Sequence, residues 1–498
     1  MKKLLPLVAV LFLLLQFLGC SSTSSPDDVA LDTTDEKLFV WNGLNHWYFW
    51  QDDVADLADN RFRNNSEFNT YLNQFSTEQS LFNQLLHRDD NFSWLIQDYK
   101  VHEEARLGIS TSFGFRFGLL RESPDNSRVI GYVRYVVPGS PAANAGLKRG
   151  DVFNGVNGQT LTVDNFQSQL RGETYALMMA KVTDFVPSPR RYTVESLDNT
   201  INVTAVNLQE NPIHRSKVIE SETSRVGYLM YNSFRFNFHD DLNQRFREFK
   251  NARIDDLVID LRYNGGGTLI TSALLASLIS GVSSDEIFAE LIHGSKRESR
   301  NSTFEFLDSV PIYDDEGSFS RTDDINSLRM NRLYVLTSRN SASASEALIN
   351  GLLPFGVEVI VIGEVTAGKD EGSITVYDAP ESNYSPRNEE QRAKINPNHM
   401  RAMQPIIFKI FNKERADYPN GFFPDFQIVE FDFLKNLPEL GEPDEPLLSA
   451  ALSHINGDGF PVVAKTQFAD SPELIFDSAE LGVLRDEIYL LPGDIELK

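Results

Sequence analysis

The order of apolar and polar positions divides the second half of the chain into alternating strands and helices. Residues 227–234 and 257–261 are apolar runs typical of strands, whereas residues 240–250 and 269–279 place apolar positions at helical spacing. Strands that alternate with helices predict a mixed α/β core. Three glycines, residues 265–267, stand between the second strand and the second helix, where they allow close backbone approach and unusual φ/ψ.

Other parts of the chain have patterns of their own. Residues 36–105 show helical periodicity with many aromatic side chains, which predicts a helical region with an aromatic core. Residues 106–205 have the pattern of short strands separated by turn residues. Residues 281–330 carry many acids and few long apolar runs. We interpret this last segment as an excursion over the face that carries the site, not as a separate domain.

The segment from residue 332 to residue 369 organises the α/β core. It contains an apolar run at 333–336, a turn rich in small and hydroxyl residues at 340–346, a helix-like stretch at 347–352 and a second apolar run at 357–362. This order predicts strand, tight turn, helix, strand and loop. The turn therefore places a serine hydroxyl at a helix N-terminus, where free backbone N–H groups and the helix dipole favour a developing anion.

Ser343 in this turn is a candidate nucleophile, and Lys369 in the following loop is the candidate base. A serine needs a neighbouring group to take its proton, and an ammonium group cannot do so. Burial away from carboxylates would depress the pKa of a lysine far enough to leave it neutral. The alternative from spacing alone is that Ser341, Ser343 and Ser345 merely cap the helix and that Lys369 is a solvated loop residue.

Composition and charge narrow the class of function. The chain has 498 residues, too many for one ordinary domain, and its 41% hydrophobic and 23% charged residues are normal for globular protein. A formal net charge of −25 argues against nucleic-acid binding and against electrostatic adhesion to anionic lipid. No phosphate-binding GxxxxGK[ST] or strand-linked GxGxxG motif is present. We expect no cofactor and no metal.

The N-terminus has the pattern of a targeting segment. Lys2 and Lys3 precede an apolar stretch, residues 4–18, that is too short for a comfortable transmembrane helix. The sequence Phe-Leu-Gly-Cys ending at Cys20, the single cysteine, resembles a bacterial lipobox. We expect residues 1–20 to be a lipoprotein signal peptide, Cys20 to become the lipidated N-terminus, and residues 21–35 to form a flexible tether. The alternative is an ordinary secretory signal cleaved nearby.

Two blocks of the core resemble a known family. The Ser-Ala-Ser-Ala-Ser-Glu turn at 341–346, followed by Gly368-Lys369, is similar to the tail-specific, or carboxy-terminal processing, serine proteases of peptidase family S41. Residues 257–267, Leu-Val-Ile-Asp-Leu-Arg-Tyr-Asn-Gly-Gly-Gly, resemble the family's apolar strand and glycine turn. The resemblance covers roughly residues 40 to 457 and implies a mixed-sheet core like that of ClpP and crotonase.

The resemblance also implies roles for single residues. It assigns Ser343 as nucleophile and Lys369 as base, and it forms the oxyanion hole from the N–H of Ala344 and that of Gly266 or Gly267. Many relatives carry Gln or Glu four residues after the lysine to orient it, and this chain has Ser373 there. If Asp370 or Glu371 lay close to Lys369, the carboxylate would raise the lysine pKa and hinder base function. Asp260 and Arg262 are expected to be structural, as an ion pair or turn anchor.

A third block resembles a PDZ domain of the protease type. It comprises a strand at 129–137, a Ser-Pro-Ala helix followed by Ala-Gly-Leu at 140–147, a Gly-Asp turn at 150–151 and an Asn-Gly hairpin at 157–158. PDZ domains bind a chain terminus by adding it to a sheet edge, while backbone N–H groups grip its carboxylate. The best candidate for that peptide-binding loop is Phe113, Gly114 and Phe115.

These observations give one domain plan and two functions. After the tether we expect an N-terminal helical region (36–105), a PDZ-like domain (106–205), a protease domain (220–457) and an extension of unknown role (458–498).

The favoured function is a serine endopeptidase that selects protein or peptide substrates by their C-terminal tails. It would be lipid-anchored in the bacterial cell envelope, on the periplasmic or surface face of a membrane. The alternative is a non-catalytic PDZ-bearing binding or chaperone protein. A Ser/His/Asp hydrolase fits poorly, since no GxSxG motif is present.

Overall fold

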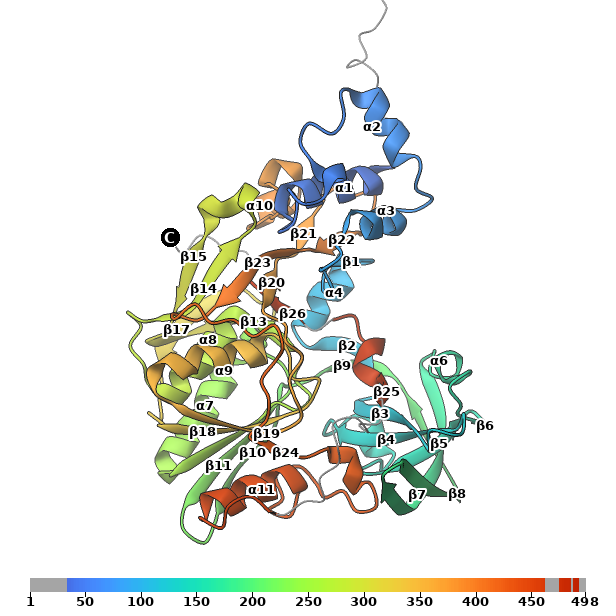
Figure 1. The fold of residues 1–498 in the computed structure, drawn as a ribbon, viewed down its shortest axis with the longest axis vertical. Helices are drawn as coiled ribbons and strands as arrows, with labels where there is room; N and C mark the ends of the chain where they lie inside the picture. The colour runs from blue at the N-terminus through green and yellow to red at the C-terminus, as the bar shows by residue number, and fades with distance from the viewer. Residues whose placement is uncertain (1–33, 462–473, 485–486, 492–498) are drawn as a thin grey trace, which may run out of the picture.

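The computed structural model describes residues 34–461, 474–484 and 487–491 and shows a mixed α/β protein (Figure 1). The N-terminal helices lie at one end of the molecule, a β-rich domain lies at the other end and to one side, and the α/β core connects them. The expected signal peptide, including Cys20, lies outside the described residues, as does the tether apart from its last two residues. No helix among the residues that the structure describes is long and apolar enough to cross a membrane.

The N-terminal region is helical, as its periodicity predicts. It contains α1 (Asp35–Trp47), α2 (Asn65–Leu72), α3 (Glu78–Leu85) and α4 (Tyr99–Arg106). Trp47, Tyr48 and Phe82 are buried together with the α/β core, so the aromatic stripe is core. The region joins the core through a three-stranded sheet in the order β1 (Trp94–Ile96), β22 (Ala402–Gln404) and β21 (Val376–Tyr377).

The β-rich domain follows. Its elements are β2 (Ile109–Ser112), β3 (Phe115–Arg121), β4 (Val129–Val136), α5 (Pro141–Asn144), β5 (Val152–Val156), β6 (Gln159–Thr160), α6 (Phe166–Gln169), β7 (Thr174–Pro187), β8 (Arg190–Thr204) and β9 (Val206–Gln209). The sheet has the order β25-β3-β4-β5-β7-β8, and its first strand, β25 (Leu474–Asp477), comes from the far end of the chain. Aromatic and aliphatic side chains fill its core, among them Phe117, Phe153 and Leu177.

A mainly parallel six-stranded sheet forms the centre of the core. Its order is β10 (Ile213–Glu220), β11 (Arg225–Tyr231), β12 (Asp256–Asp260), β18 (Arg332–Thr337), β19 (Glu358–Gly363) and β24 (Phe426–Gln427). Successive side chains point to opposite faces of a strand. Accordingly, Leu257 and Ile259 pack under α7 (His239–Ala252), α8 (Leu269–Ser280) and α9 (Ala344–Leu352), whereas Val258 packs against α11 (Pro446–Ile455) on the other face.

A second six-stranded sheet covers the outer side of α8 and α9, so that these helices lie between two sheets (Figure 1). Its order is β13 (Gly266–Thr268), β26 (Glu487–Tyr489), β20 (Glu371–Ser373), β23 (Ile406–Phe411), β14 (Ile287–His293) and β15 (Ser302–Glu305). The hairpin of β16 (Ser309–Tyr313) and β17 (Phe319–Asp324) and the short α10 (Glu389–Arg392) complete the core.

The expectation that residues 281–330 form an excursion over the site is wrong. Strand β14 pairs with both β15 and β23 and is an inner strand of the second sheet. Phe288 and Leu291 are buried, while Glu290 forms an ion pair with Arg415. Glu290 lies between the buried residues Ala289 and Leu291, so the acid-rich composition of the segment obscured a largely buried strand.

Candidate active site

The nucleophile turn begins where β18 ends, next to the end of the parallel strand β12. Ser341 Oγ donates to the carbonyl of Leu261 at 2.8 Å, and Ser345 Oγ donates to the carbonyl of Asn264 at 2.9 Å. These two serines therefore anchor the turn to the segment that follows β12. The Ser343 side-chain oxygen is buried and has no hydrogen-bond partner among the described residues. The suggestion that all three serines merely cap the helix does not describe this arrangement.

Ser343 is also held in a strained backbone conformation. Its φ is 64° and its ψ is −110°, at the residue that precedes α9. Positive φ costs a residue with a Cβ roughly 1–3 kcal/mol and persists where the surrounding structure enforces it. Backbone strain of this kind is concentrated at active sites. The strain and the buried hydroxyl, which has no hydrogen-bond partner among the described residues, therefore fit the predicted nucleophile.

The glycine turn after β12 lies directly against this serine. Gly266 and Gly267 have φ values of +118° and +143°. A Cβ on Gly266 would lie 2.9 Å from Ser343 Cβ and 2.3 Å from the carbonyl oxygen of Glu487, so only glycine fits there. The Gly266 N–H donates to Asn264 Oδ1 at 2.9 Å. The N–H of Gly266 is thus bound by this amide, whereas Gly267, the other glycine proposed for the oxyanion hole, lies in the ladder between β13 and β26.

Ala344 is the first residue of α9. The first N–H groups of a helix have no partner within the helix, so the Ala344 N–H meets the requirement for an oxyanion donor. Gly267 lies in β13, where its register partner is Ile488 of β26. The structure therefore brings the predicted nucleophile, both oxyanion candidates and an unpredicted C-terminal strand to one place.

The carboxylate of Glu346, in the first turn of α9, joins the backbones of the two predicted catalytic residues. Its Oε2 accepts the N–H of Ser343 at 2.8 Å and the N–H of Lys369 at 2.9 Å. Its Oε1 accepts the N–H of Gly368 at 2.6 Å and the hydroxyl of Thr366. Burial raises the pKa of Glu346, and these four hydrogen bonds oppose that effect. This positioning residue was missed by sequence reasoning, although Ser-x-x-Glu at a helix start is the pattern of a capping box.

Lys369 is 1% exposed, so the alternative of a solvated loop residue is wrong. Its Nζ lies 4.8 Å from the centroid of the Phe92 ring. The preceding Gly368 has a φ of +81°, and a Cβ there would lie 2.6 Å from the carbonyl oxygen of Pro419. The glycine thus lets the chain turn close to a neighbouring backbone and direct the lysine into the core.

Two acids follow the lysine, and both are buried. Burial raises the pKa of Glu371 to about 7 and also raises the pKa of Asp370. The carboxylate of Glu371 pairs with Lys409 at 3.4 Å. Near neutral pH Glu371 is therefore partly protonated, which weakens the negative charge that would hinder Lys369 if the two side chains lay close together.

Ser373, the residue in place of the family's lysine-orienting Gln or Glu, lies in β20. Its Oγ accepts from Gln404 Nε2 at 2.8 Å and donates to the carbonyl of Ile488 at 3.3 Å. These contacts hold β26 and β22 against β20. A direct role of Ser373 in orienting Lys369 stays a prediction.

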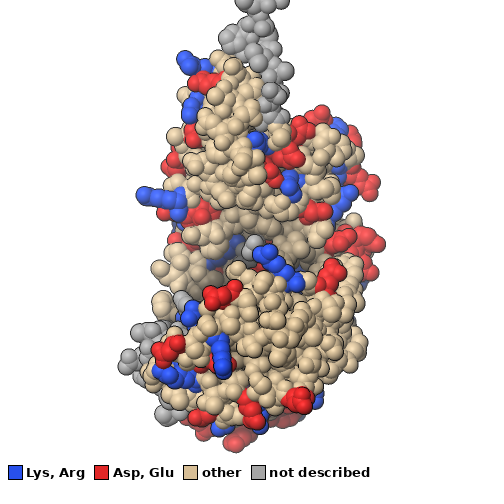
Figure 2. All heavy atoms as spheres, turned by 90° about the vertical axis from the view of Figure 1, so that its right-hand side faces the viewer, with Lys and Arg blue, Asp and Glu red and all other residues tan. Residues whose placement is uncertain are grey.

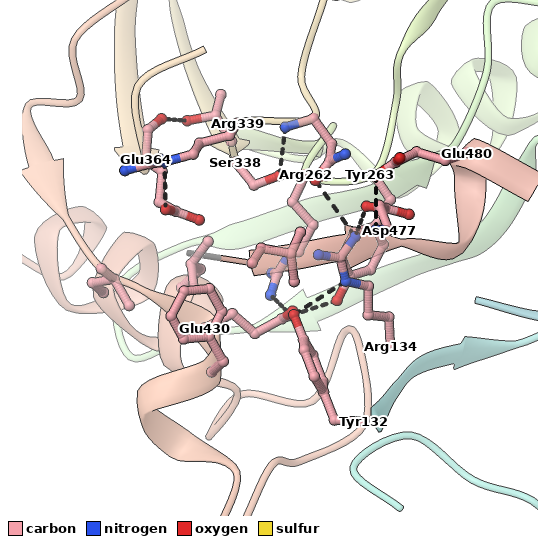
Figure 3. A pocket seen from close by; sticks show the side chains of 16 residues that line it. Tyr132, Arg134, Arg262, Tyr263, Ser338, Arg339, Glu364, Glu430, Asp477 and Glu480 are labelled. Atoms are coloured by element: carbon pink, nitrogen blue, oxygen red, sulfur yellow. Dashed lines mark hydrogen bonds and ion pairs between the residues drawn. The ribbon is translucent and has the colours of Figure 1, made fainter. Parts of the chain in front are cut away.

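A buried network of charges lies between the core and the β-rich domain, and Figure 3 shows the part of it that contains Arg262 and Glu430. Arg262 pairs with Asp260 at 2.8 Å, which confirms their structural role, and its guanidinium also contacts Glu445 at 2.5 Å. Arg149 of the β-rich domain donates to Glu430 at 2.6 Å and to Glu445 at 3.3 Å. Burial opposes the charge of Glu430, but the guanidinium groups of Arg149 and Arg262 lower its pKa to about 2. The network fixes the β-rich domain to the catalytic sheet.

A cleft of about 600 Å³ runs between the predicted peptide-binding loop and the glycine turn. Phe113 and Phe115 line one part, and residues 265–267 line another. Gly114, with a φ of +76°, packs against Ser140 and shapes the loop between the two aromatic residues. Figure 2 looks onto this side of the molecule, where a hollow separates the N-terminal helices above from the β-rich domain below. No group of three or more His, Cys, Asp or Glu within the described ranges could hold a metal ion.

Comparison with family models assigns the three parts of this arrangement. Residues 225–381, which carry the glycine turn, Ser343 and Lys369, match the model of peptidase family S41. The catalytic core is therefore similar to peptidase family S41. Residues 35–94 match the N-terminal domain of S41 peptidases, and residues 132–182 match the PDZ domain. The β-rich domain is therefore a PDZ insert before the S41 core.

Curated relatives agree at low identity. The chain is 26% identical over 236 residues to the carboxyl-terminal-processing protease of Picosynechococcus, an alignment that covers 47% of this chain and 49% of the relative. It is 25% identical over 374 residues to the chloroplastic carboxyl-terminal-processing peptidase 2 of Arabidopsis thaliana, covering 72% and 65%. The matched regions thus span about half to two thirds of these relatives.

Among solved structures, the fold is similar to a putative S41 protease from Bacteroides fragilis. The TM-score is 0.63 at 24% identity, and the match covers 84% of this chain and 97% of that one. At this identity the likeness shows the fold alone.

Proposed function

We propose that this protein is a serine endopeptidase in which Ser343 and Lys369 form the catalytic dyad. The observation that carries the proposal is the arrangement at Glu346. One carboxylate oxygen holds the backbone of a strained, unpartnered serine and the backbone of a buried lysine at the same time. The family assignment of the core supports this reading.

The chemistry requires Lys369 to be neutral when a substrate is bound. Its amine takes the Ser343 proton as Oγ attacks the scissile carbonyl, and the new C–O bond leaves negative charge on the carbonyl oxygen. The N–H groups of Ala344 and Gly267 would stabilise that oxyanion, which is worth a few kcal/mol for two donors. The lysine ammonium then protonates the leaving amine. Water hydrolyses the acyl-enzyme by the same proton transfers in reverse order.

The test is cleavage of an unfolded protein by the full chain. We expect wild type to cleave it and Ser343→Ala to be inactive, while the matched variant Ser345→Ala keeps activity because Ser345 only anchors the turn. If wild type and Ser343→Ala were equally inactive, yet both bound peptides, the alternative of a non-catalytic PDZ-bearing binding or chaperone protein would be favoured.

For substrates, we propose selection through C-terminal tails by the PDZ insert. Edge pairing with β3 and capture of a free carboxylate near Phe113, Gly114 and Phe115 would read a free, apolar chain end. The names of the curated relatives, which are carboxyl-terminal-processing proteases, support this class. Unchanged binding of a peptide after its carboxylate is converted to an amide would refute the assignment.

For localisation, we propose a lipid anchor at Cys20 in a bacterial cell envelope, on the periplasmic or surface face of a membrane. The support is the lipobox-like sequence that ends at the single cysteine. Acyl chains contribute roughly 0.8 kcal/mol per buried methylene, so the mature protein should partition with membranes. Cys20→Ala should release it or stall its processing, and membrane partitioning that is unaffected by this change would exclude the anchor.

A further inference from the structure

The C-terminal segment of this chain lies where the proposed function needs a substrate. Strand β25 pairs antiparallel with β3, the edge strand of the PDZ sheet, with Leu474 opposite Leu120 and Asp477 opposite Gly118. A peptide ligand of a PDZ domain joins the sheet as such an added edge strand. The direction also fits, because β25 is antiparallel to β3 and therefore runs toward Phe115, the end of β3 next to the predicted carboxylate loop.

The side chains of β25 contact α6, β3 and β4 of the PDZ insert as those of a bound peptide would. The ring of Phe476 lies 5.5 Å from that of Phe166 in α6 and 6.4 Å from that of Phe117 in β3. Asp477 forms a buried ion pair with Arg134. At the end of the strand, Ser478 Oγ accepts the N–H of Phe117 at 2.9 Å, in place of a main-chain carbonyl. Leu474, Ile475 and Phe476 are only half-buried.

The same segment then reaches the catalytic turn. Strand β26 lies between β13, the glycine turn, and β20, which follows Lys369. A Cβ on Gly266 would lie 2.9 Å from Ser343 Cβ and 2.3 Å from the carbonyl oxygen of Glu487 in β26. The Glu487 carbonyl oxygen and the Ser343 side chain therefore both border the space beside Gly266. A substrate strand that delivers its carbonyl to Ser343 needs this space.

We propose that residues 474–484 and 487–490 are a tethered peptide ligand of the protein's own substrate path. The described state is then a self-occupied one, and a protein substrate must displace the segment from the PDZ edge and from the glycine turn. The sequence of the segment also indicates which substrate tails would compete best. Such a tail would carry an apolar residue, then an aromatic residue that packs against Phe117 and Phe166, and then an acidic residue that pairs with Arg134. This inference rests on the proposed peptidase function for its site, but the binding part of its test does not require catalysis.

The alternative is that the segment is a permanent part of the fold, because Ile488 of β26 is fully buried. Point variants in β25 separate the two readings without removing β26. Phe476→Ser with Asp477→Asn weakens the groove contacts. The matched control is Leu481→Ser on the same segment, since Leu481 is 47% exposed.

The first measurement is binding of a fluorescent peptide, Leu-Ile-Phe-Asp-Ser-Ala-Glu-Leu, to the full chain carrying Ser343→Ala. We expect the double variant to bind it at least tenfold more tightly than the parent, equivalent to 1.4 kcal/mol, and the control to match the parent. In the chain that retains Ser343, the double variant should also hydrolyse a short reporter peptide at least tenfold faster. Equal binding together with an equal or lower rate would overturn the proposal.

If the double variant does not fold, hydrogen exchange on the parent decides the matter. An excess of the same peptide should speed amide exchange in residues 474–477, and unchanged exchange at a saturating peptide concentration would overturn the proposal. The two proposals fail separately. A tail that is displaced in a protein that never cleaves would refute the dyad alone, whereas Ser343-dependent cleavage with a fixed tail would refute the tethered ligand alone.

Discussion

The hydrogen bonds around Glu346 allow a graded test of the dyad geometry. Replacing Glu346 by Ala removes the acceptor of three backbone N–H groups and one hydroxyl. Replacing it by Gln keeps one acceptor oxygen. The amide can point its NH₂ group toward Thr366, whose hydroxyl is able to turn and accept, and keep its oxygen toward Ser343 and Lys369. In that orientation only the Gly368 N–H loses its partner.

The expected loss of stability follows from the number of hydrogen bonds that each variant removes. A hydrogen bond to a charged group contributes about 1.5–3 kcal/mol, and a buried donor left without a partner costs about 1–3 kcal/mol. Burial already opposes the Glu346 charge, as its raised pKa shows, so losing the charge returns part of this cost. We expect the free energy of unfolding to fall by about 2 kcal/mol in Glu346→Gln and by about 4 kcal/mol or more in Glu346→Ala.

Activity should follow the same order. Because a misplacement of about 1 Å can cost roughly a hundredfold in rate, Glu346→Ala should lower kcat at least that far while KM changes little. Glu346→Gln should retain most of kcat. The assay is hydrolysis of a reporter peptide, combined with urea unfolding, and Glu358→Ala is the control because Glu358 is exposed on β19. If Glu346→Ala lost stability but kept kcat within about threefold, the carboxylate would support the fold and not the dyad.

Three further predictions follow from the same site. Lys369→Arg should be as inactive as Lys369→Ala in the reporter assay, because a guanidinium stays protonated at any working pH. Substantial activity of the arginine variant would mean that another residue is the base. The pKa of Glu371 rises from 4.5 to about 7 on folding. The folded state therefore favours the protonated carboxyl. As the pH rises from 4.5 to about 7, the free energy of unfolding of wild type should fall by up to about 3 kcal/mol relative to that of Glu371→Gln. Parallel dependence of the two unfolding free energies on pH, measured in urea, would contradict this shift of the pKa. Ser345→Ala should cost about 1 kcal/mol of stability through its bond to Asn264, and a loss of kcat comparable to that of Ser343→Ala would show that the nucleophile is misassigned.

The turn of Ser343 was predictable because its signals are local. The apolar runs of β12 and β18, the glycines after one and the serines after the other all lie within short stretches. Parallel strands end at the same edge of a sheet, which brings the two turns together. Glu346 was visible only as half of a capping box, since its other partners lie 20 to 23 positions away, beyond β19.

Other features depend on pairings that no local pattern reveals. Strand β14 contains one acid, Glu290, between the buried residues Ala289 and Leu291, and it lies in a segment rich in acids that obscured this strand of the second sheet. Strands β25 and β26 have four and three residues, and their partners lie more than 100 residues away in sequence. Strands this short carry too little periodicity to be recognised, and only the folded chain shows which edges they join.

The charge network between the two domains has a consequence for how the PDZ insert should be studied. Deleting the insert would remove Arg149 and leave Glu430 and Glu445 to Arg262 alone, at the edge of the catalytic sheet. Breaking a buried charge pair by removing one partner costs about 3–5 kcal/mol. A deletion would thus weaken the protease itself, and its loss of activity would say nothing about recognition. We therefore expect the two domains to unfold together, so substrate selection in this protein is best dissected by single substitutions in the groove.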